Sequence, residues 1–272
     1  MRLDGRTALI TGGTQGVGAA IAAALASAGA NIVLHGLRDD EQAQKTLEIC
    51  RAKNVSASLV TADLMADTDN AVVRLATSAL DFEPTIDLLV NNAGAYIDKP
   101  FLEMDYETFD RTMRLNVAAG YFLTQYFARR WIEQRTKGRV LFTGSINGLL
   151  AEPTHTAYDA SKAAVAGLVR SLCVTLAPHG IRVNAMAPGL VRTPLTNQVL
   201  DSNPAALEWM KLHTPNGSVP EPDVCGGAAV FLLSDLAEHI HGQTLYVDGG
   251  MSAWQQPDLP VGLEKGPLRI VR

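Results

Sequence analysis

The stretch HTAYDASKAAVAG carries two reactive side chains, Tyr158 and Lys162, in a run of otherwise small and apolar residues. Alanine-rich sequence favours a helix, and residues four apart lie one turn apart on the same helix face. A free phenol has a pKa of about 10 and is a poor base at neutral pH. A neighbouring ammonium favours the phenolate, so we expect Lys162 to lower the pKa of Tyr158 and Tyr158 to act as an acid or base at an alcohol or carbonyl oxygen.

Three glycines, Gly12, Gly16 and Gly18, separate an apolar run from the alanine-rich segment that follows in LITGGTQGVGAAIAAALASAGA. Glycine allows a tight turn and a close approach of the backbone to a ligand, and the start of a helix offers free N–H groups to a pyrophosphate. The spacing is Gly-xxx-Gly-x-Gly and differs from the commoner GxGxxG, so the strand–turn–helix context carries the interpretation. The sequence predicts a dinucleotide site here, and a glycine-rich turn without a ligand is the alternative.

The end of the second predicted strand discriminates between the two nicotinamide cofactors. In GANIVLHGLRDD, the position at which a carboxylate would bond a ribose 2′-hydroxyl is Gly36, and Arg38 follows it. The missing carboxylate removes a repulsion, and a guanidinium is a planar donor for a phosphate. Asp39, Asp40 and the neutral Gln15 argue against this interpretation, and a solvated loop charge is the alternative role of Arg38. The sequence favours NADP over NAD.

The elements that must position these groups are seven apolar runs that alternate with segments of helical length. The runs are residues 7–11, 31–36, 56–61, 86–92, 138–144, 181–188 and 243–249. Strands of continuous apolar character that alternate with helices predict a parallel sheet with both faces covered. With right-handed crossovers, this is an α/β fold: a single doubly wound Rossmann-type domain, which we place over residues 1–251.

Composition excludes several classes of protein. The 272 residues carry a formal net charge of −5, and Lys and Arg are scattered, which is not typical of a nucleic-acid-binding surface. The three cysteines form no CxxC and suggest buried thiols in a reducing compartment. The N-terminus lacks the apolar core of a signal peptide, and we expect no apolar run of the roughly 20 residues that cross a membrane. We therefore expect a cytoplasmic protein that acts on a small molecule, without a nucleic-acid or membrane partner.

The glycine turn is the first of several motifs along the chain. They are TGGTQGVG (11–18), Asp63 after the third predicted strand, NNAG (91–94), Asn116 in RLNVAAG, Ser145 in TGSING, YDASK (158–162), PGLVRT (188–193) and YVDGG (246–250). With these motifs, over about residues 6–251, the chain resembles the short-chain dehydrogenase/reductase family. The resemblance implies a seven-stranded sheet in the order 3-2-1-4-5-6-7, nicotinamide-dependent chemistry on CH–OH and C=O groups, and a homotetramer or dimer.

The resemblance also implies roles by position. Ser145 would hydrogen-bond the substrate oxygen and steady the charge that develops there. Lys162 would also bond the nicotinamide ribose, and Asn116 would hold a water that links Lys162 to solvent. At the pyrophosphate, the implied cofactor-binding residues are Gly12, Thr14, Gln15, Gly16, Val17 and Gly18. Asp63 and Leu64 would lie beside the adenine, and Asn92, Ala93 and Gly94 on the adenosine side of the groove. The nicotinamide would contact Pro188, Gly189, Val191 and Thr193, and Arg38, Tyr158 and Lys162 complete the set.

The expected substrate pocket mixes apolar and polar groups, which suits a medium-sized ketone or secondary alcohol. Asn147, His155 and Leu190 are candidate substrate-binding residues beside Ser145 and Tyr158. For His155, a place in the pocket wall is an equal alternative. The resemblance favours a 3-oxoacyl-acyl-carrier-protein reductase. A sugar or polyol dehydrogenase is the alternative, because no basic patch for an acidic carrier stands out.

Other kinds of function fit less well. A serine hydrolase would need GxSxG around Ser145, whereas the sequence reads GSING with Thr143 at the first glycine position. His239 and His241 lack a third ligand, so we expect no metal site. A sensor that only binds the cofactor would normally have lost one of Asn116, Ser145, Tyr158 and Lys162, and all four are present.

Two segments depart from the alternating pattern. Residues 192–223 contain five prolines and suggest a lid or substrate loop, and residues 252–272 suggest a C-terminal extension. The helical segments 105–134 and 157–178 carry apolar residues on more than one side, which favours a homo-oligomer.

Overall fold

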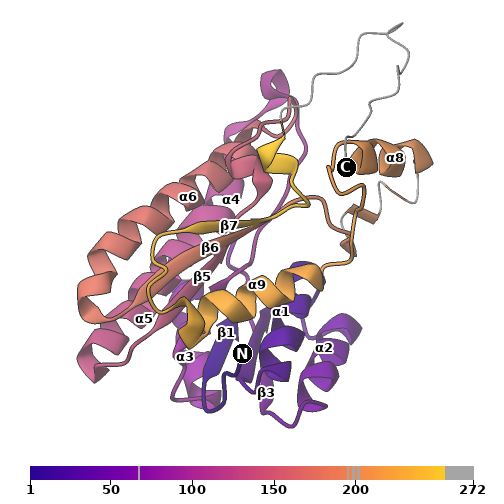
Figure 1. Cartoon of the computed structure of the whole chain (residues 1–272). Coiled ribbons are helices and arrows are strands. Elements are labelled where there is room, and N and C mark those ends of the chain that lie inside the picture. The colour runs from indigo at the N-terminus through magenta and orange to yellow at the C-terminus, as the bar shows by residue number, and fades with distance from the viewer. Residues whose placement is uncertain (67, 195, 198–199, 201–202, 255–272) are drawn as a thin grey trace, which may run out of the picture.

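The computed structural model describes residues 1–66, 68–194, 196–197, 200 and 203–254 (Figure 1). Its centre is a seven-stranded sheet in the order β3-β2-β1-β4-β5-β6-β7, and every neighbouring pair is parallel. The strands are β1 (Thr7–Ile10), β2 (Asn31–Gly36), β3 (Ala57–Thr61), β4 (Leu88–Asn91), β5 (Arg139–Thr143), β6 (Arg182–Pro188) and β7 (Thr244–Val247). The predicted fold class, the seven strands and their order are confirmed.

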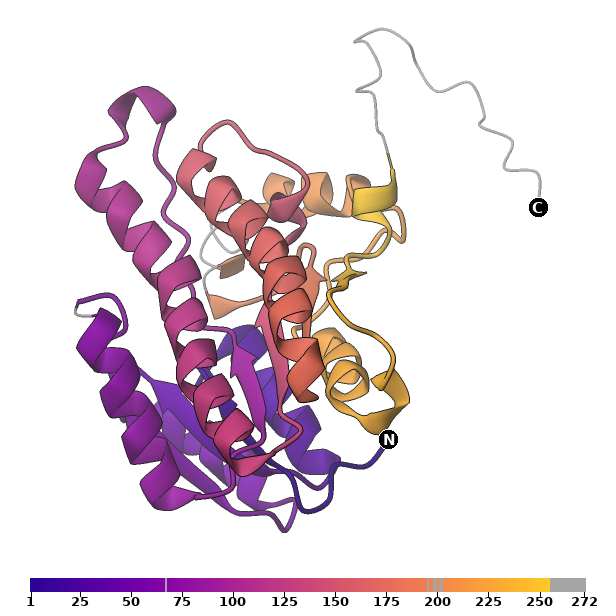
Figure 2. The same cartoon turned by 90° about the vertical axis from the view of Figure 1, so that its left-hand side faces the viewer.

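Helices cover both faces of the sheet. One face carries α1 (Gly16–Ser27), α2 (Glu41–Arg51) and α9 (Val224–Leu233). The other carries α3 (Thr68–Phe82), α4 (Tyr106–Met113), α5 (Ala119–Gln134) and α6 (Thr156–Leu176), and Figure 2 shows α5 and α6 running side by side. The short helical turns are η1 (Phe101–Glu103), η3 (Ile146–Gly148), η4 (Ala177–His179), η5 (Asp235–Ala237) and η6 (Met251–Ala253).

The continuous apolar runs follow from this two-sided burial. In β1, Leu9 points into the layer of α3, α5 and α6, whereas its neighbours Ala8 and Ile10 point into the layer of α1, α2 and α9. All three side chains are fully buried. Successive strand residues alternate between the faces, so a sheet with both faces covered needs apolar residues at every position.

The segment 105–134, expected as one helix, is interrupted. Asp105 caps α4 by accepting a bond from the amide of Thr108 at 2.7 Å, and α4 ends at Met113. A π-helical turn, Arg114–Ala118, follows before α5 begins. Such a turn holds one more residue than an α-helical turn, and it often marks a functional position. Here it contains Asn116.

The expectation of no uninterrupted apolar run of this length stands, because the one long apolar helix in the described residues contains Asp159, Lys162 and Arg170. Thr156–His179 meets the requirements of length and composition for a membrane span, with a mean hydropathy of 1.4. It consists of α6 and η4, and its Ser161, Lys162, Val165 and Val169 are buried within the protein. The stretch reaches this hydropathy because Ala, Val and Leu residues continue beyond its buried face, and 28% of it is buried.

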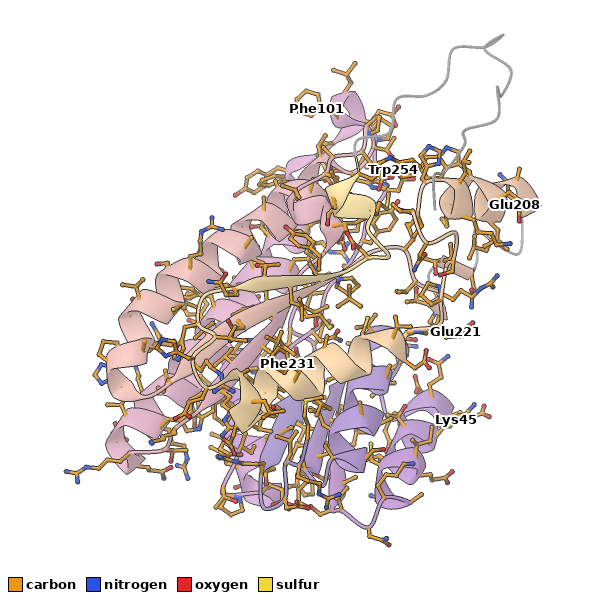
Figure 3. The ribbon with its side chains drawn as sticks, in the orientation of Figure 1. Lys45, Phe101, Glu208, Glu221, Phe231 and Trp254 are labelled. Atoms are coloured by element: carbon orange, nitrogen blue, oxygen red, sulfur yellow. The ribbon has the colours of Figure 1, made fainter. Side chains whose placement is uncertain are left out.

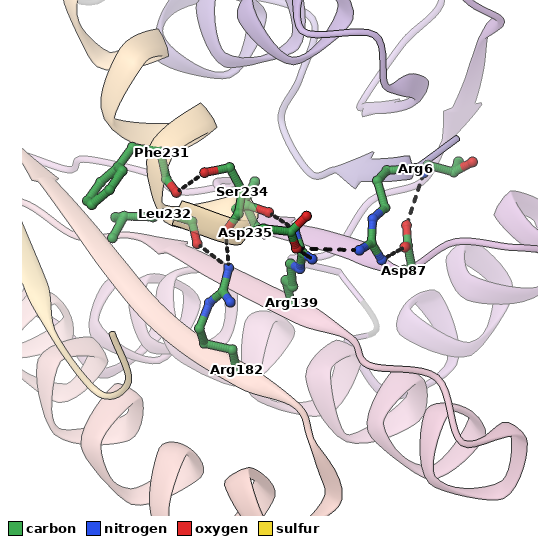
Figure 4. Close-up of polar contacts among 10 residues, drawn as sticks. Arg6, Asp87, Arg139, Arg182, Phe231, Leu232, Ser234 and Asp235 are labelled. Atoms are coloured by element: carbon green, nitrogen blue, oxygen red, sulfur yellow. Dashed lines mark hydrogen bonds and ion pairs between the residues drawn. The ribbon is translucent and has the colours of Figure 1, made fainter. Parts of the chain in front are cut away.

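Two arginines at the amino ends of β5 and β6 reach the carboxyl end of α9 (Figure 4). Arg182 donates to the carbonyls of Leu232 at 3.0 Å and Ser234 at 2.7 Å, and Arg139 donates to the carboxylate of Asp235. The last carbonyls of a helix lack partners within it and carry a partial negative charge. The two guanidinium groups therefore cap α9 and fix it across the edge of the sheet opposite the glycine turn.

The segment 192–223 is not entirely a loop. It contains α8 (Pro204–Leu212), which begins after Asn203, whose side chain accepts a bond from the amide of Ala205. Figure 1 shows α8 beyond the carboxyl end of β6, apart from the sheet, and the Glu208 side chain in Figure 3 lies on its outer side. Most of the expected C-terminal extension, residues 255–272, lies outside the described residues, as do parts of the expected lid.

Candidate active site

The glycine turn after β1 has backbone angles and close contacts that require glycine. Gly12 and Gly16 have φ angles of +60° and +54°, in the left-handed region that favours glycine. A Cβ atom on Gly18 would lie 2.0 Å from the carbonyl oxygen of Gly12. Gln15, at the N-cap of α1, makes no side-chain capping bond, and the first turn of α1 has no acidic residue. The turn and the uncapped N–H groups of α1 thus fit a dinucleotide pyrophosphate.

Asn92 holds the turn from the side of β4. Its amide nitrogen donates to the carbonyls of Thr11 at 3.1 Å and Gly12 at 3.0 Å. The hydroxyl of Thr11 in turn accepts from the backbone amides of Asn92 and Ala93 at 2.9 and 3.0 Å. Both donor hydrogens of the Asn92 side chain are therefore engaged in shaping the turn. Gly94, two residues on, is exposed.

His35 holds the same turn from the side of β2, and this role is not among those predicted from the sequence. Its Nδ1 accepts from the amide of Gly12 at 3.2 Å, and its Nε2 bonds the carbonyl of Ala62 at 3.1 Å. Burial is the main cause that lowers the pKa of His35. The available signal was a lone imidazole inside the apolar strand NIVLHG, directly before the position that selects the cofactor.

Arg38 is exposed to solvent. A Cβ on Gly36 would lie 2.6 Å from Cγ2 of Thr14, so a carboxylate at position 36, which NAD selection would need, would require the Thr14 side chain to move. The two aspartates that argued against NADP are both engaged. Asp40 caps α2, because its side chain accepts from the amide of Ala43 at 3.0 Å. Asp39 accepts from the side chain of Gln44 in the same helix.

Two further segments implied to contact the cofactor flank the turn. After β3, Leu64 is buried and Oδ1 of Asp63 accepts from the amides of Met65 at 2.8 Å and Ala66 at 3.2 Å. After β6, Thr193 comes so close to the turn that its Cγ2 would lie 3.6 Å from a Cβ on Gly16. Pro188 ends β6, Gly189 packs against Asp248, and Val191 and Leu190 follow.

Tyr158 and Ser145 come together where β5 gives way to η3 and α6 begins. Ser145 lies two residues beyond β5, and a hydrogen bond between its hydroxyl and the phenol of Tyr158 favours the phenolate. Burial is nevertheless the larger effect, and it raises the pKa of Tyr158. The expectation that this pKa is lowered is therefore wrong for the protein alone.

Lys162 does not offset the effect of burial on Tyr158. Its Nζ donates to the carbonyl of Thr143 at 2.9 Å and lies 5.6 Å from the centroid of the Tyr158 ring. Burial lowers the pKa of Lys162 to about 8. Spacing of i and i+4 places the two side chains on one face of α6, as predicted, but the ammonium bonds the end of β5, where it is not in contact with the phenol oxygen.

Asn116 joins three parts of the site from its π-helical turn. Its Oδ1 accepts from the amide of Ala95 at 2.8 Å, and its Nδ2 donates to the carbonyl of Ala95 at 2.9 Å and to Oγ of Ser161 at 2.9 Å. The hydroxyl of Ser161 donates to the carbonyl of Tyr158 at 2.6 Å. The Asn116 side chain thus ties the segment after β4 to the helix that carries Tyr158.

Tyr96 and His155 form the side of the site next to the Tyr158 ring. The Tyr96 hydroxyl bonds Nε2 of His155, and the Tyr96 ring meets the Tyr158 ring edge to face with centroids 5.4 Å apart. Burial and nearby carboxylates raise the pKa of Tyr96 to about 12, so it stays protonated. His155 is buried, and its Nδ1 lies 3.4 Å from a carboxylate oxygen of Glu152.

A polar chain continues from Ser145 to two carboxylates. The Ser145 hydroxyl accepts from the amide of Asn147 at 3.1 Å. The Asn147 side chain donates to Asp159 at 2.9 Å and to Glu152 at 3.2 Å. The donor hydrogens of Asn147 are therefore engaged within the protein, and Glu152 and Asp159 bring negative charge to the site. In the described residues, no cluster of three or more His, Cys, Asp or Glu side chains has the arrangement of a metal site.

The sheet order, the glycine turn and the grouping of serine, tyrosine and lysine at the carboxyl ends of β4 and β5 are those of a Rossmann-type oxidoreductase. The family described as Enoyl-(Acyl carrier protein) reductase matches residues 12–252. The chain belongs to the short-chain dehydrogenase/reductase family, whose members oxidise CH–OH groups or reduce C=O groups.

Individual relatives differ in the substrate they are named for. The chain is 32% identical over 93% of its length to a glucose 1-dehydrogenase of Gluconobacter oxydans, of which it covers 94%. It is 32% identical over 92% of its length to a 3-oxoacyl-[acyl-carrier-protein] reductase of Aquifex aeolicus, of which it covers 99%. A gluconate 5-dehydrogenase of Burkholderia cenocepacia, solved with NADP and tartrate, aligns with a TM-score of 0.84 and 35% identity over 93% of this chain and 98% of that one.

Proposed function

We propose that this protein is an NADP-dependent dehydrogenase of a sugar or polyol. The polar rim around Tyr158, formed by Asn147, Glu152, His155, Asp159 and Tyr96, is the observation that carries the proposal. A sugar presents several hydroxyl groups, each a donor and an acceptor, and the carboxylates of Glu152 and Asp159 can accept from them. Two of the three relatives described above are named for a sugar or a sugar acid.

The residues present fit the cofactor. The turn of Gly12, Gly16 and Gly18 would hold the pyrophosphate, Arg38 would meet the 2′-phosphate, and the segment 188–193 would hold the nicotinamide. Because position 36 carries no carboxylate and Arg38 is exposed, this end of the groove suits a phosphorylated ribose. When bound, the nicotinamide supplies or accepts the hydride.

The protein's own groups handle the proton and the charge on oxygen. Ser145 donates a hydrogen bond to the reacting oxygen and stabilises its partial negative charge. In alcohol oxidation the phenolate of Tyr158 takes the hydroxyl proton, and in ketone reduction the phenol returns it. Lys162, anchored on Thr143, supplies positive charge behind the phenolate, and Asn116 fixes the backbone on both sides of this group.

A 3-oxoacyl-carrier reductase is the second candidate, favoured by the Aquifex relative. An acyl carrier protein is acidic, and a docking surface for it needs basic residues near the entrance. Glu152 and Asp159, which raise the pKa of Tyr158, instead place negative charge there. We therefore rank the sugar or polyol activity first.

The assembly and cellular context belong to the same proposal. Residues 1–251 would form the dinucleotide-binding and catalytic unit, with residues 192–223 as its lid. Leu102 and Tyr106, at and after η1, are 94% and 83% exposed, and Phe101 beside them is labelled in Figure 3. Exposed apolar side chains of this size support a homotetramer or dimer. We further propose that the protein acts in the cytoplasm.

The decisive experiment measures steady-state rates with NADP(H) and NAD(H) against glucose, rhamnose, gluconate, a polyol and a 3-oxoacyl thioester. We expect kcat/KM for the best sugar or polyol to exceed that for the thioester by at least about tenfold, or about 1.4 kcal/mol. The reverse ratio would overturn the proposal in favour of the second candidate. Tyr158→Phe should abolish turnover, and Tyr121→Phe, at a tyrosine of α5 outside the site, is the matched control.

A further inference from the structure

The peptide groups of Gly12 are held by two side chains from opposite sides. Its carbonyl accepts from Asn92, which follows β4, and its amide donates to Nδ1 of His35, which lies in β2. The backbone of His35 adds a third contact, because its carbonyl accepts from the amide of Gly13 at 2.9 Å. The first glycine of the turn therefore takes its position from both neighbouring strands.

The other ring nitrogen of His35 reaches the third strand. Nε2 bonds the carbonyl of Ala62, the residue directly after β3 and directly before Asp63. The imidazole thus spans from the turn that would hold the pyrophosphate to the segment that would lie beside the adenine. It is only 4% exposed, so these two bonds replace water for both of its nitrogens.

The two hydrogen-bond partners of the His35 ring are compatible with only one protonation state of the imidazole. A backbone N–H only donates, so Nδ1 must accept, and a carbonyl only accepts, so Nε2 must donate. Both conditions hold only in the neutral imidazole with its hydrogen on Nε2. Among the charged groups around the ring, Asp63 acts from the end of β3 and favours the protonated form, whereas the turn 11–18 carries no ionisable side chain.

We propose that His35 is a positioning residue for the dinucleotide, which in its neutral form sets the spacing between the pyrophosphate turn and the adenine-side segment. This inference rests on the proposed cofactor binding. Loss of either ring bond would free the Gly12 amide or the Ala62 carbonyl, and the two ends of the cofactor site could then shift relative to one another. Protonation would break the bond to Gly12 in the same way as a mutation does.

The test compares NADPH dissociation constants, measured by ligand fluorescence, across three variants. His35→Leu removes both bonds and should weaken binding at least tenfold. In His35→Asn, the side-chain oxygen can accept from Gly12 as Nδ1 does, so we expect most of the affinity to return. Ile32→Ala, in the same strand but on its other face, is the control: it should lower the melting temperature and leave the dissociation constant unchanged.

Each result decides between the two proposals. Unchanged affinity in His35→Leu, or an equal loss in Ile32→Ala, would overturn the role of His35. A wild-type protein that binds neither NADPH nor NADH would instead overturn the proposed function.

A measurement on the wild type covers the case in which His35→Leu does not fold. Nitrogen-15 NMR of the imidazole should show an unprotonated Nδ1 near neutral pH, and NADPH affinity should fall as acid protonates His35. An Nδ1–H tautomer, or the same acid profile of affinity in His35→Asn, would contradict the proposal.

Discussion

Lys162 donates to the carbonyl of Thr143 at 2.9 Å while its ammonium lies 5.6 Å from the centre of the Tyr158 ring. The lysine is thus fixed to the end of β5, and the tyrosine is held by Ser145 and the edge of Tyr96. Burial acts on the two groups in opposite senses: it raises the pKa of the phenol and lowers that of the ammonium to about 8. Near pH 7 the phenol is therefore neutral, whereas the ammonium, with a pKa of about 8, is still mostly protonated.

Replacing Lys162 with methionine should stabilise the folded protein near neutral pH. Below pH 8 the wild type buries a charged ammonium, whereas between about pH 8 and 10.5 the unfolded chain holds a proton that the folded one has released. Wild-type stability therefore rises with pH across that window. The gain for Lys162→Met should be at most about 3 kcal/mol near pH 7 and shrink toward pH 10, offset by about 1 kcal/mol for the lost bond to Thr143. Melting temperatures across pH 6–10 test this, and a variant less stable at pH 7 would contradict it.

Glu152→Gln should make Tyr158 easier to ionise. The carboxylate of Glu152 is among the groups that raise the pKa of Tyr158, so its neutral replacement lowers that pKa. In alcohol oxidation, where the phenolate accepts the proton, the rise of kcat with pH should then begin at lower pH. Glu48→Gln, on the exposed side of α2, is the matched control and should leave the pH profile unshifted. A shift to higher pH in Glu152→Gln would show that its charge does not act on Tyr158.

Gly18→Ala should remove cofactor binding, because the new Cβ would lie 2.0 Å from the carbonyl oxygen of Gly12. The colliding atom is backbone, so the whole turn must move, and we expect NADPH affinity to fall at least tenfold. Gly227→Ala in α9 adds the same methyl group where no atom lies within 4 Å. That control should bind NADPH normally and gain up to about 1 kcal/mol of stability. Normal binding by Gly18→Ala would mean that the turn is not the pyrophosphate site.

Arg182→Met should destabilise the protein without changing its kinetics at low temperature. It leaves the carbonyls of Leu232 and Ser234 at the end of α9 without their donor, at a cost of about 2–4 kcal/mol. Urea denaturation measures this loss, and Lys53→Met, at an exposed position, should cause little change. An unchanged midpoint for Arg182→Met would show that α9 does not need this cap.

The sequence was sufficient for the features that depend on pattern. Apolar runs with both faces buried predicted all seven strands, and the motifs around Gly12, Asn116, Ser145 and Tyr158 supplied the family and, through it, the strand order. These signals are local in the chain, since each rests on a few adjacent residues. Resemblance to a family adds the order in which the strands pair, which local patterns do not contain.

The features that the sequence did not predict depend on contacts between distant segments. The bonds of His35 to residues 12 and 62, and that of Tyr96 to His155, join residues from different strands and loops. The spacing of Tyr158 and Lys162 placed them on one helix face but could not show that the carbonyl of Thr143 takes the ammonium. The sign of the pKa shift of Tyr158 follows from its burial, which only the folded chain reveals.

The extra residue in the π-helical turn sets the relative rotation of α4 and α5 about their common axis. One residue adds about 100° of rotation in a helix. The buried face of α5 is therefore rotated relative to that of α4, compared with an uninterrupted α-helix. Deleting a residue between Arg114 and Ala118 would restore ordinary winding and turn one of the two helices away from its neighbours. The register on either side of Asn116 is therefore fixed by chain length, independently of which side chains occupy the helices.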